Sequence, residues 1–386
     1  MKGVRKMKRY LRVALMIFGL IFICVSAGFA QEDKVNIEDL YQRLKNLEKR
    51  VDDPEKKPDG LLDKVSEQVT FSGAIDLDFS YKNPQDIAGE KSDSTSDLDV
   101  GTVALGFEVA FHDWITGNFV LKGENLDTDN KVFWDEVAIT IGNEGFPLYF
   151  VAGKRGQPFG LFESHLINDP LTQDCYEITE TGATVGFAPG VLGIDISMTA
   201  YRGETLIEHL NDAGVGFTRA GAEDTDDVSS FIGNATMEPL GGLLLAVYWN
   251  TEPGIDDRNE TAGVTVHYEF WKIALDWEYI GALQREKTYD GSEHTESAWF
   301  AGSAFQVTDS LEVALRYEAY SDDIGGEQNE HLENRYSIGA NYTLFERDNF
   351  STTLMIEYRK SNYEKAPGSS AHDEADEFFS RLAIAF

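Results

Sequence analysis

A strict two-residue alternation that begins at Val69 constrains the fold more than any other feature. One parity of this stretch is apolar or glycine and the other is small or acidic: Val69, Phe71, Gly73, Ile75, Leu77, Phe79 and Tyr81 against Thr70, Ser72, Ala74, Asp76, Asp78 and Ser80. Successive side chains of a β-strand point to opposite faces of the sheet. The stretch therefore predicts a strand with one apolar face and one polar face.

The same alternation recurs through the rest of the chain. We expect sixteen strands, near residues 69–81, 98–111, 115–126, 131–141, 147–154, 181–188, 191–201, 228–237, 242–250, 260–270, 272–280, 296–307, 311–320, 332–342, 350–360 and 376–386. Most of them approach the ~9–11 residues that a tilted strand needs to cross a bilayer. The strand number is even, and short connections alternate with long ones, as in bacterial outer-membrane barrels.

The segment 376–386 ends the chain on an aromatic residue, Phe386, which shares its parity with Phe378, Leu382 and Ile384. The closing strand of a barrel needs a lipid-facing apolar side and an aromatic residue at the membrane interface. The predicted fold class is therefore all-β. We expect a 16-stranded antiparallel transmembrane β-barrel over residues 69–386, preceded by a short N-terminal periplasmic coiled-coil helix.

Residues 1–30 have the pattern of a secretory signal peptide. Basic residues at the amino terminus precede the apolar run 13–25, and small residues lead to Ala30, after which we expect cleavage. An uncleaved membrane anchor is the alternative, for which the apolar run is short. Export and a barrel together predict a location in the outer membrane of a Gram-negative bacterium.

Residues 31–68 have a helical period in place of the two-residue period. Apolar residues at alternating spacings of three and four form a seam: Ile37, Leu40, Leu44, Leu47 and Val51. The seam predicts a short coiled coil and linker, which a homotrimer would bring together. A single amphipathic helix at the periplasmic mouth of the barrel explains the pattern equally well.

The formal net charge of the whole chain is −34. All charged residues of the predicted signal peptide are basic, so its cleavage makes the net charge more negative. This balance excludes nucleic acid as a partner. It suits a surface of lipid and lipopolysaccharide that divalent cations cross-bridge. After removal of the signal peptide Cys175 is the remaining cysteine, so the sequence predicts no intrachain disulfide.

The polar parity of the strands carries the residues that we expect to line a water-filled lumen. They are charged and of both signs: Glu108, Lys122, Glu124, Glu136, Arg316, Glu318, Arg335, Arg359 and Arg381. A barrel of about sixteen strands encloses an aqueous channel that its wall side chains do not fill. Internal salt bridges that plug a narrower pore are the alternative.

The long connection 155–180 mixes apolar residues with charges, whereas outer loops that face water are usually polar. We expect this loop to fold inward and narrow the pore. The candidate constriction residues are Lys154, Arg155, Glu163, His165 and Asp169. A loop that contacts its own barrel wall or a neighbouring subunit is the alternative.

Residues 153–182 also carry a family resemblance. Gly153-Lys154, Pro158-Phe159-Gly160, Asp169-Pro170-Leu171-Thr172 and Glu180-Thr181-Gly182 resemble the corresponding pattern of the LbtU family of siderophore porins. That resemblance implies an outer-membrane barrel that takes up a ferric siderophore without a plug domain. It implies no ligand residues, so the candidate site depends on the loop and the parity alone.

The chemistry of an enzyme is not visible in the sequence. The seven histidines are scattered, with no pair at metal-ligand spacing, and no phosphate-binding or nucleophile motif occurs. We therefore expect no catalytic residues, no metal and no cofactor. The predicted function is a porin for small solutes, with a ferric siderophore as the implied cargo. A general or carbohydrate-type diffusion porin and a non-transporting surface adhesin barrel are the alternatives.

Overall fold

The computed structural model describes residues 68–85, 93–124, 126, 131–212, 227–254, 257–287, 294–323, 332–347, 349–363 and 374–386. The chain separates into two compact units, Met1–Lys64 and Val65–Phe386. Every described residue belongs to the second unit. The predicted signal peptide 1–30 and coiled coil, and all but the last residue of the segment 31–68, lie outside the described residues.

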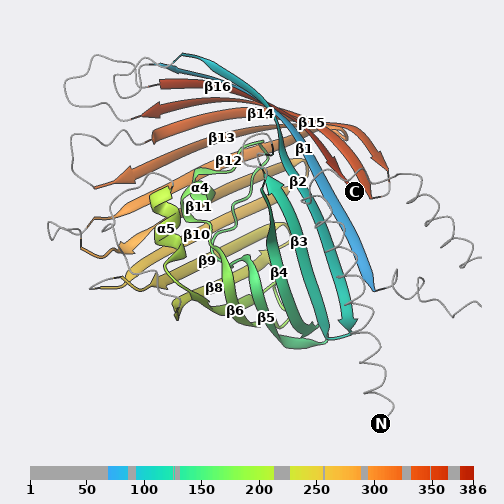
Figure 1. Ribbon diagram of the computed structural model, residues 1–386, viewed down its shortest axis with the longest axis vertical. Helices are drawn as coiled ribbons and strands as arrows, with labels where there is room; N and C mark the ends of the chain where they lie inside the picture. The colour runs from blue at the N-terminus through green and yellow to red at the C-terminus, as the bar shows by residue number, and fades with distance from the viewer. Residues whose placement is uncertain are drawn as a thin grey trace, which may run out of the picture. The chain divides into compact units, whose positions relative to one another are not determined.

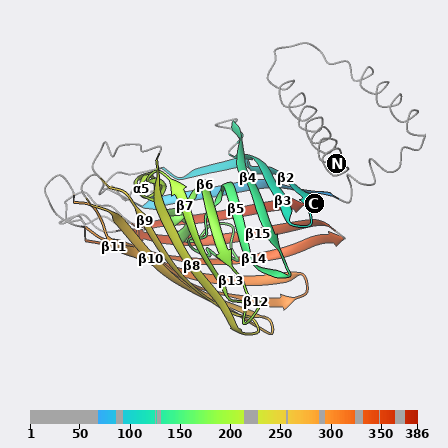
Figure 2. The same cartoon turned by 90° about the horizontal axis from the view of Figure 1, so that it is seen from below.

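The second unit is a closed antiparallel β-barrel in which each strand pairs with its neighbours in the chain and β1 pairs with β16 (Figures 1 and 2). Its strands are β1 Val69–Gln85, β2 Thr95–His112, β3 Ile115–Glu124, β4 Lys131–Asn143, β5 Phe146–Gly156, β6 Thr179–Phe187, β7 Asp195–Arg202, β8 Val228–Leu240, β9 Leu243–Glu252, β10 Asn259–Phe270, β11 Ile273–Gln284, β12 Glu296–Thr308, β13 Leu311–Asp322, β14 Leu332–Arg347, β15 Phe350–Tyr363 and β16 Glu374–Ala385. The predicted fold class and all sixteen strands are confirmed.

The last residue takes part in closing the barrel. The Gly73 amide donates to the Phe386 carbonyl at 2.8 Å, and the Phe386 amide donates to the Gly73 carbonyl at 3.0 Å. A Cβ on Gly73 would lie 2.4 Å from Cζ of the Phe386 ring, so the absence of a side chain at residue 73 lets the ring lie over β1. This pairing leaves no free edge between the first and last strands.

The two faces of the wall are those that the alternation predicts. On β11, Trp277 and Tyr279 are 38% and 40% exposed, whereas the intervening Glu278 is 0% exposed. Strand β1 likewise turns Phe71 and Leu77 outward. An exterior of large apolar side chains around a polar interior is the pattern of a barrel that spans lipid.

Aromatic pairs lie at the end of the barrel where the short turns are. The ring centroids of Trp114 and Phe146 are 5.8 Å apart, and those of Phe345 and Phe350 are also 5.8 Å apart. Trp271, in the turn between β10 and β11, is 79% exposed. Such a girdle anchors a barrel at the membrane–water interface.

Some strand boundaries differ from the expected ones. The seventh strand begins at Asp195 and not near residue 191, because Leu192 and Gly193 have positive φ angles of 53° and 57° and form a turn. In contrast, β1 extends to Gln85 and β2 begins at Thr95, beyond both predicted ends. The charged residues near this outer end therefore belong to the wall.

Two short helices, α4 (Leu171–Tyr176) and α5 (Thr205–Asp212), lie within the ring of strands in Figure 1. The Glu252 carboxylate of β9 accepts hydrogen bonds from the first amides of α5, at 2.9 Å from Leu206 and 3.2 Å from Ile207. Both helices share an apolar cluster with inward side chains of the wall. In the described part of the chain, neither helix has the length and apolar character to cross a membrane.

Candidate functional site

The connection between β5 and β6, residues 157–178, lies on the inner face of the barrel. The Leu161 amide donates to Oε2 of Glu278 at 2.8 Å, and the Thr172 hydroxyl donates to Oε1 of the same carboxylate at 2.6 Å. Glu278 alternates with exposed residues of β11, so these bonds form on the lumen side of the wall. The loop is therefore inside the barrel.

Two further buried carboxylates bind the backbone of the loop. Oε2 of Glu357 accepts both the backbone amide and the side-chain amide of Asn168, each at 2.9 Å. Oε1 of Glu318 accepts the Leu171 amide at 2.6 Å. Both carboxylates are 0% exposed, and hydrogen bonds to such buried charges are among the stronger ones in proteins.

Arg316 of β13 completes this attachment. Its guanidinium donates to the Ser164 hydroxyl at 2.8 Å and to the carbonyls of Asn168 and Asp169 at 3.0 and 2.9 Å. Its Nε lies 3.2 Å from Oε2 of Glu318. We call the inner face of β11–β15, to which the loop is bound, the latched wall.

An apolar contact fixes the tip of the loop on the latched wall. Leu166 is 7% exposed and packs with Ala274, Ala304 and Ala314. A Cβ on Gly339 would lie 2.5 Å from Cδ2 of Leu166. Small residues on neighbouring strands thus leave a depression that the leucine side chain fills.

His165 lies among carboxylates at the same tip. Its Nδ1 is 3.2 Å from Oε1 of Glu312, its Nε2 is 3.5 Å from Oδ2 of Asp276, and its carbonyl accepts the Asn341 amide at 2.9 Å. The hydrogen bond to Glu312 raises the pKa of His165 above its usual value, although burial opposes that shift. The charged imidazole is therefore favoured at this position.

The side chain of Asp169 is exposed, whereas its backbone carbonyl accepts a hydrogen bond from Arg316. Loss of hydration inside the barrel raises the pKa of its carboxyl, and Glu177 adds to this effect. The charges of Arg316, Arg381 and Lys122 oppose it. Asp169 is therefore within electrostatic range of β16 and β3, on the far side of the lumen from β11.

The inner face of β16, β1, β2 and β3 is here called the open wall. Arg381 binds Asp78 through two hydrogen bonds of 2.7 Å, and Lys122 lies 2.6 Å from Oε1 of Glu124. The side chains of Arg381 and Lys122 remain 25% and 29% exposed. These pairs retain contact with the solvent of the lumen, unlike Glu278, Glu318 and Glu357 of the latched wall, which are 0% exposed.

The other predicted lining residues are inward in register but differ in exposure. Arg335 lies 3.5 Å from Asp174 of the loop, and Arg359 lies 2.7 Å from Glu377. Both arginines are buried. Glu108 and Glu136 are on the inner rows of β2 and β4, because they pair with Thr70 and Val120.

The predicted constriction residues do not form one group. His165 and Asp169 are in the inward loop, and Glu163 is exposed in the same loop. Arg155 is on the inner row of β5 and donates to the Thr184 hydroxyl at 3.2 Å. The structure does not bring Lys154 to these residues.

Lys154 pairs with Thr181 and shares the outward row of Phe150. Its ammonium donates to the Trp134 carbonyl at 2.9 Å and lies 5.8 Å from the centre of the Phe133 ring. The expectation that Lys154 points into the pore with the loop residues is therefore corrected.

Ser164 and Asn168 of the loop take part in its attachment and were not among the predicted site residues. On the wall the loop is held by Asp276, Glu278, Glu312 and Glu357, which the inward parity predicted to line the pore. The four acids have the inward parity that the sequence shows, but parity does not distinguish a loop anchor from a residue exposed to the lumen. Among the described residues, no group of three or more histidine, cysteine or acidic side chains could hold a metal ion.

No family model matches the chain. A protein of Coxiella burnetii described as a UPF0422 protein is 24% identical over 324 residues, which are 77% of this chain and 65% of that protein. The UPF0422 protein lpl2888 of Legionella pneumophila is 22% identical over 60% of this chain and 47% of its own length. The chain thus spans less than two thirds of these curated relatives.

Solved structures show the fold. The anion-selective porin of Comamonas acidovorans superposes with a TM-score of 0.57 over 82% of this chain and 98% of its own, at 15% identity. The outer-membrane channel DcaP of Acinetobacter baumannii gives 0.57 over 82% and 96%, at 13% identity. A trimer form of OmpT from Vibrio cholerae gives 0.52 over 82% and 99%, at 10% identity.

The structural similarity to porins and the apolar exterior of the barrel wall indicate the same fold. The barrel has sixteen strands, as its porin neighbours do, and it turns large apolar side chains outward. Its interior holds a loop that buried carboxylates bind to one side. The chain therefore has a porin-like channel fold and belongs in the outer membrane of a Gram-negative bacterium.

Proposed function

We propose that the barrel lets small solutes diffuse across the outer membrane between the inward loop and the open wall. The observation that carries this proposal is the asymmetry of the lumen. The loop is attached to the latched wall by buried carboxylates, and the exposed Asp169 is within electrostatic range of the partly exposed Arg381 and Lys122 of the open wall. Charged, solvated side chains on both sides suit an aqueous path.

The charges along this path favour cations and neutral solutes over simple anions. Arg381 and Lys122 are each paired with an acid of the same wall, Asp78 and Glu124. Asp76, Asp169 and Glu177 add negative charge near them. A lumen with excess negative charge enriches cations and slows the entry of anions.

Reconstitution into planar lipid bilayers tests the channel. We expect stepwise current increases and a reversal potential in a KCl gradient that indicates preference for K⁺. A barrel that inserts, as judged by protease protection, but carries no current would contradict the proposal and would favour the adhesin alternative.

The finer proposal is that a ferric siderophore is among the solutes. It is supported by the resemblance of residues 153–182 to siderophore porins. Liposomes that contain the barrel should take up radiolabelled ferric siderophore faster than liposomes that contain a boiled sample. Uptake no faster than that of an inert sugar of equal size would leave a general diffusion porin.

We also propose a homotrimer in a lipid and lipopolysaccharide environment. The trimer form of the Vibrio cholerae neighbour supports this assembly, as does the predicted coiled coil in residues 31–68. Native mass spectrometry of the full chain in detergent should give three copies. A monomer that keeps its channel activity would refute the trimer and leave the pore proposal intact.

A further inference from the structure

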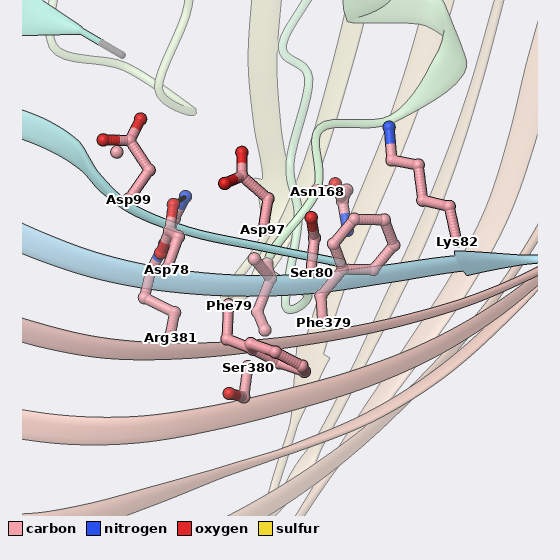
Figure 3. A pocket seen from close by; sticks show the side chains of 12 residues that line it. Asp78, Phe79, Ser80, Lys82, Asp97, Asp99, Asn168, Phe379, Ser380 and Arg381 are labelled. Carbon is pink, nitrogen blue, oxygen red and sulfur yellow. Dashed lines mark hydrogen bonds and ion pairs between the residues drawn. The ribbon is translucent and has the colours of Figure 1, made fainter. Parts of the chain in front are cut away.

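The barrel wall carries hollows on both of its faces. The hollow of the open wall, of about 190 Å³, faces the lumen and is lined by charged side chains that include Asp78, Lys82 and Arg381 (Figure 3). Arg381 binds Asp78, and Lys82 lies 3.9 Å from Glu377, so these charges are matched within the wall. A larger hollow, of about 490 Å³, lies on the outer surface of β12–β15, where the barrel faces lipid.

Two register rows of outward residues surround the outer hollow: Ala301, Tyr317 and Tyr336, then Ser303, Leu315 and Ile338. The residues of β12 in these rows are short, whereas Leu315, Tyr336 and Ile338 are large and more than half exposed. Gly302, Arg316 and Ser337 also border the hollow, but they belong to the inward parity and reach it with backbone atoms. Short side chains beside tall ones thus form an apolar groove on the outside of the latched wall.

Aromatic rings separate this groove from a polar rim. The ring centroids of Tyr317 and Tyr336 are 4.8 Å apart, and those of Trp299 and Tyr317 are 5.3 Å apart. One row closer to the long connections, Asn334 pairs with Asn362, whose side-chain amide donates to Oδ1 of Asn334 at 2.6 Å. Aromatic residues between apolar and polar rows mark the membrane–water interface. The groove therefore lies just inside the outer interface of the membrane.

The surroundings of the groove indicate what occupies it. It is continuous with the lipid-facing exterior, because Leu315 and Ile338 belong to the outward rows of β13 and β14. In lipid, association depends on packing contacts, because acyl chains are as apolar as the wall. A groove that touches a chain on several sides makes more of these contacts than a flat wall does. An apolar groove one row below a polar rim also matches the acyl chain and headgroup of a single lipid.

We propose that this groove binds one acyl chain of a lipopolysaccharide molecule, whose headgroup lies at the level of Asn334 and Asn362. The long connections place this end of the barrel in the outer leaflet, where lipopolysaccharide takes the place of phospholipid. The asparagine amides can donate to sugar or phosphate oxygens of the headgroup. The inference rests on the lipopolysaccharide environment proposed above and is independent of conduction through the lumen.

Native mass spectrometry of the full chain, extracted from outer membranes in a mild detergent, tests the site. We expect the unmodified barrel to retain one lipopolysaccharide molecule per copy of the chain. Ala301→Phe places a ring in the groove and should lower the affinity for the lipid about tenfold, because the chain loses its packing contacts. Ala235→Phe is the matched control, since Ala235 pairs with the exposed Val247 on the outer face of β8 and β9, away from the groove.

A second pair of variants removes bulk from the wall in place of adding it. Tyr336 and Tyr342 both lie on the outer face of β14 and are 53% and 47% exposed, but only Tyr336 borders the groove. Tyr336→Ala removes one side of the groove and should lower the retained lipopolysaccharide. Tyr342→Ala should retain as much of it as the unmodified barrel.

Equal retention in Ala301→Phe and Ala235→Phe overturns the proposal, as does phosphatidylethanolamine retained in place of lipopolysaccharide. The same spectra count the copies in each assembly. Fewer copies in Ala301→Phe than in the unmodified barrel would assign the groove to a contact between subunits and overturn the lipid site. Conductance in KCl separates this outcome from the channel, because the four substitutions leave every charge of the lumen in place.

Discussion

The latched wall and the open wall have the same sequence pattern and different environments. Both carry charged residues on the inward parity of several strands. On the latched wall Glu278, Glu318 and Glu357 are completely buried beneath the loop, whereas Arg381 and Lys122 of the open wall stay in contact with solvent. The comparison shows that the odd or even position of a residue in its strand determines whether its side chain faces the lumen or the lipid. Whether a charged side chain in the lumen is buried or solvated depends on the inward loop.

The largest expected difference between the walls follows from Arg316→Ala. The substitution removes the guanidinium that donates to Ser164, Asn168 and Asp169. It also leaves the buried Glu318 carboxylate without the ion pair to Arg316. Loss of one partner of a buried ion pair costs about 3–5 kcal/mol in the free energy of unfolding. Urea unfolding of the barrel in phosphatidylcholine vesicles, followed by tryptophan fluorescence, measures it, and a loss below about 1 kcal/mol would refute the latch.

A smaller effect is expected from Gly339→Ala, which tests the apolar part of the latch. The added Cβ would lie 2.5 Å from Leu166 Cδ2 and 2.8 Å from the Ile356 carbonyl, so the loop tip must shift. Overpacking of this kind costs about 1–3 kcal/mol. Gly233→Ala is the matched control, because its Cβ would meet only the Trp249 ring at 3.8 Å. Equal stability of the two variants would show that Leu166 does not hold the tip.

On the open wall, Arg381→Ala should change selectivity more than stability. Its ion pair with Asp78 is partly exposed, so we expect a loss of about 1 kcal/mol or less. Removal of this positive charge makes the net charge of the lumen more negative. It should therefore raise the preference for K⁺ in a KCl gradient. A stability loss as large as that of Arg316→Ala would erase the distinction between the walls.

The smallest expected effect is the pH dependence of the His165 contact. Glu312 raises the pKa of His165 in the folded state, so the charged histidine stabilises the loop fully below its unfolded pKa near 6.5. That stability is lost as the pH rises through the higher folded-state pKa. Replacement by glutamine should therefore destabilise the barrel more at about pH 6 than at about pH 9. A difference that grows with pH would have the wrong sign.

Much of the wall could be predicted because lipid imposes a two-residue period on every strand. That period found all sixteen strands, including β5 and β6 on either side of the inward loop. It missed the true ends of β1 and β2, so Lys82 and Asp97 were assigned to a loop and not to the wall. The late start of β7 depends on the positive φ angles of Leu192 and Gly193. The alternation of apolar and polar residues does not predict backbone angles.

The site was less predictable because it depends on contacts between residues far apart in the chain. The composition of the loop indicated an inward fold, and His165 and Asp169 are indeed inside the barrel. Its anchors, such as Glu278 and Glu357, lie more than a hundred residues away. Lys154 was assigned to the pore from its place beside the loop, but the register of β5 turns it outward.

The central claim, a solvated path along the open wall, is tested most directly by thiol labelling of single channels. Lys122→Cys is compared with Ser337→Cys, which is 4% exposed on the latched wall, both with Cys175→Ser to remove the native buried thiol. A cationic methanethiosulfonate should permanently reduce the current through Lys122→Cys and leave that through Ser337→Cys unchanged. Reduced current for Ser337→Cys with no change for Lys122→Cys would place the path on the other side of the loop and contradict this account.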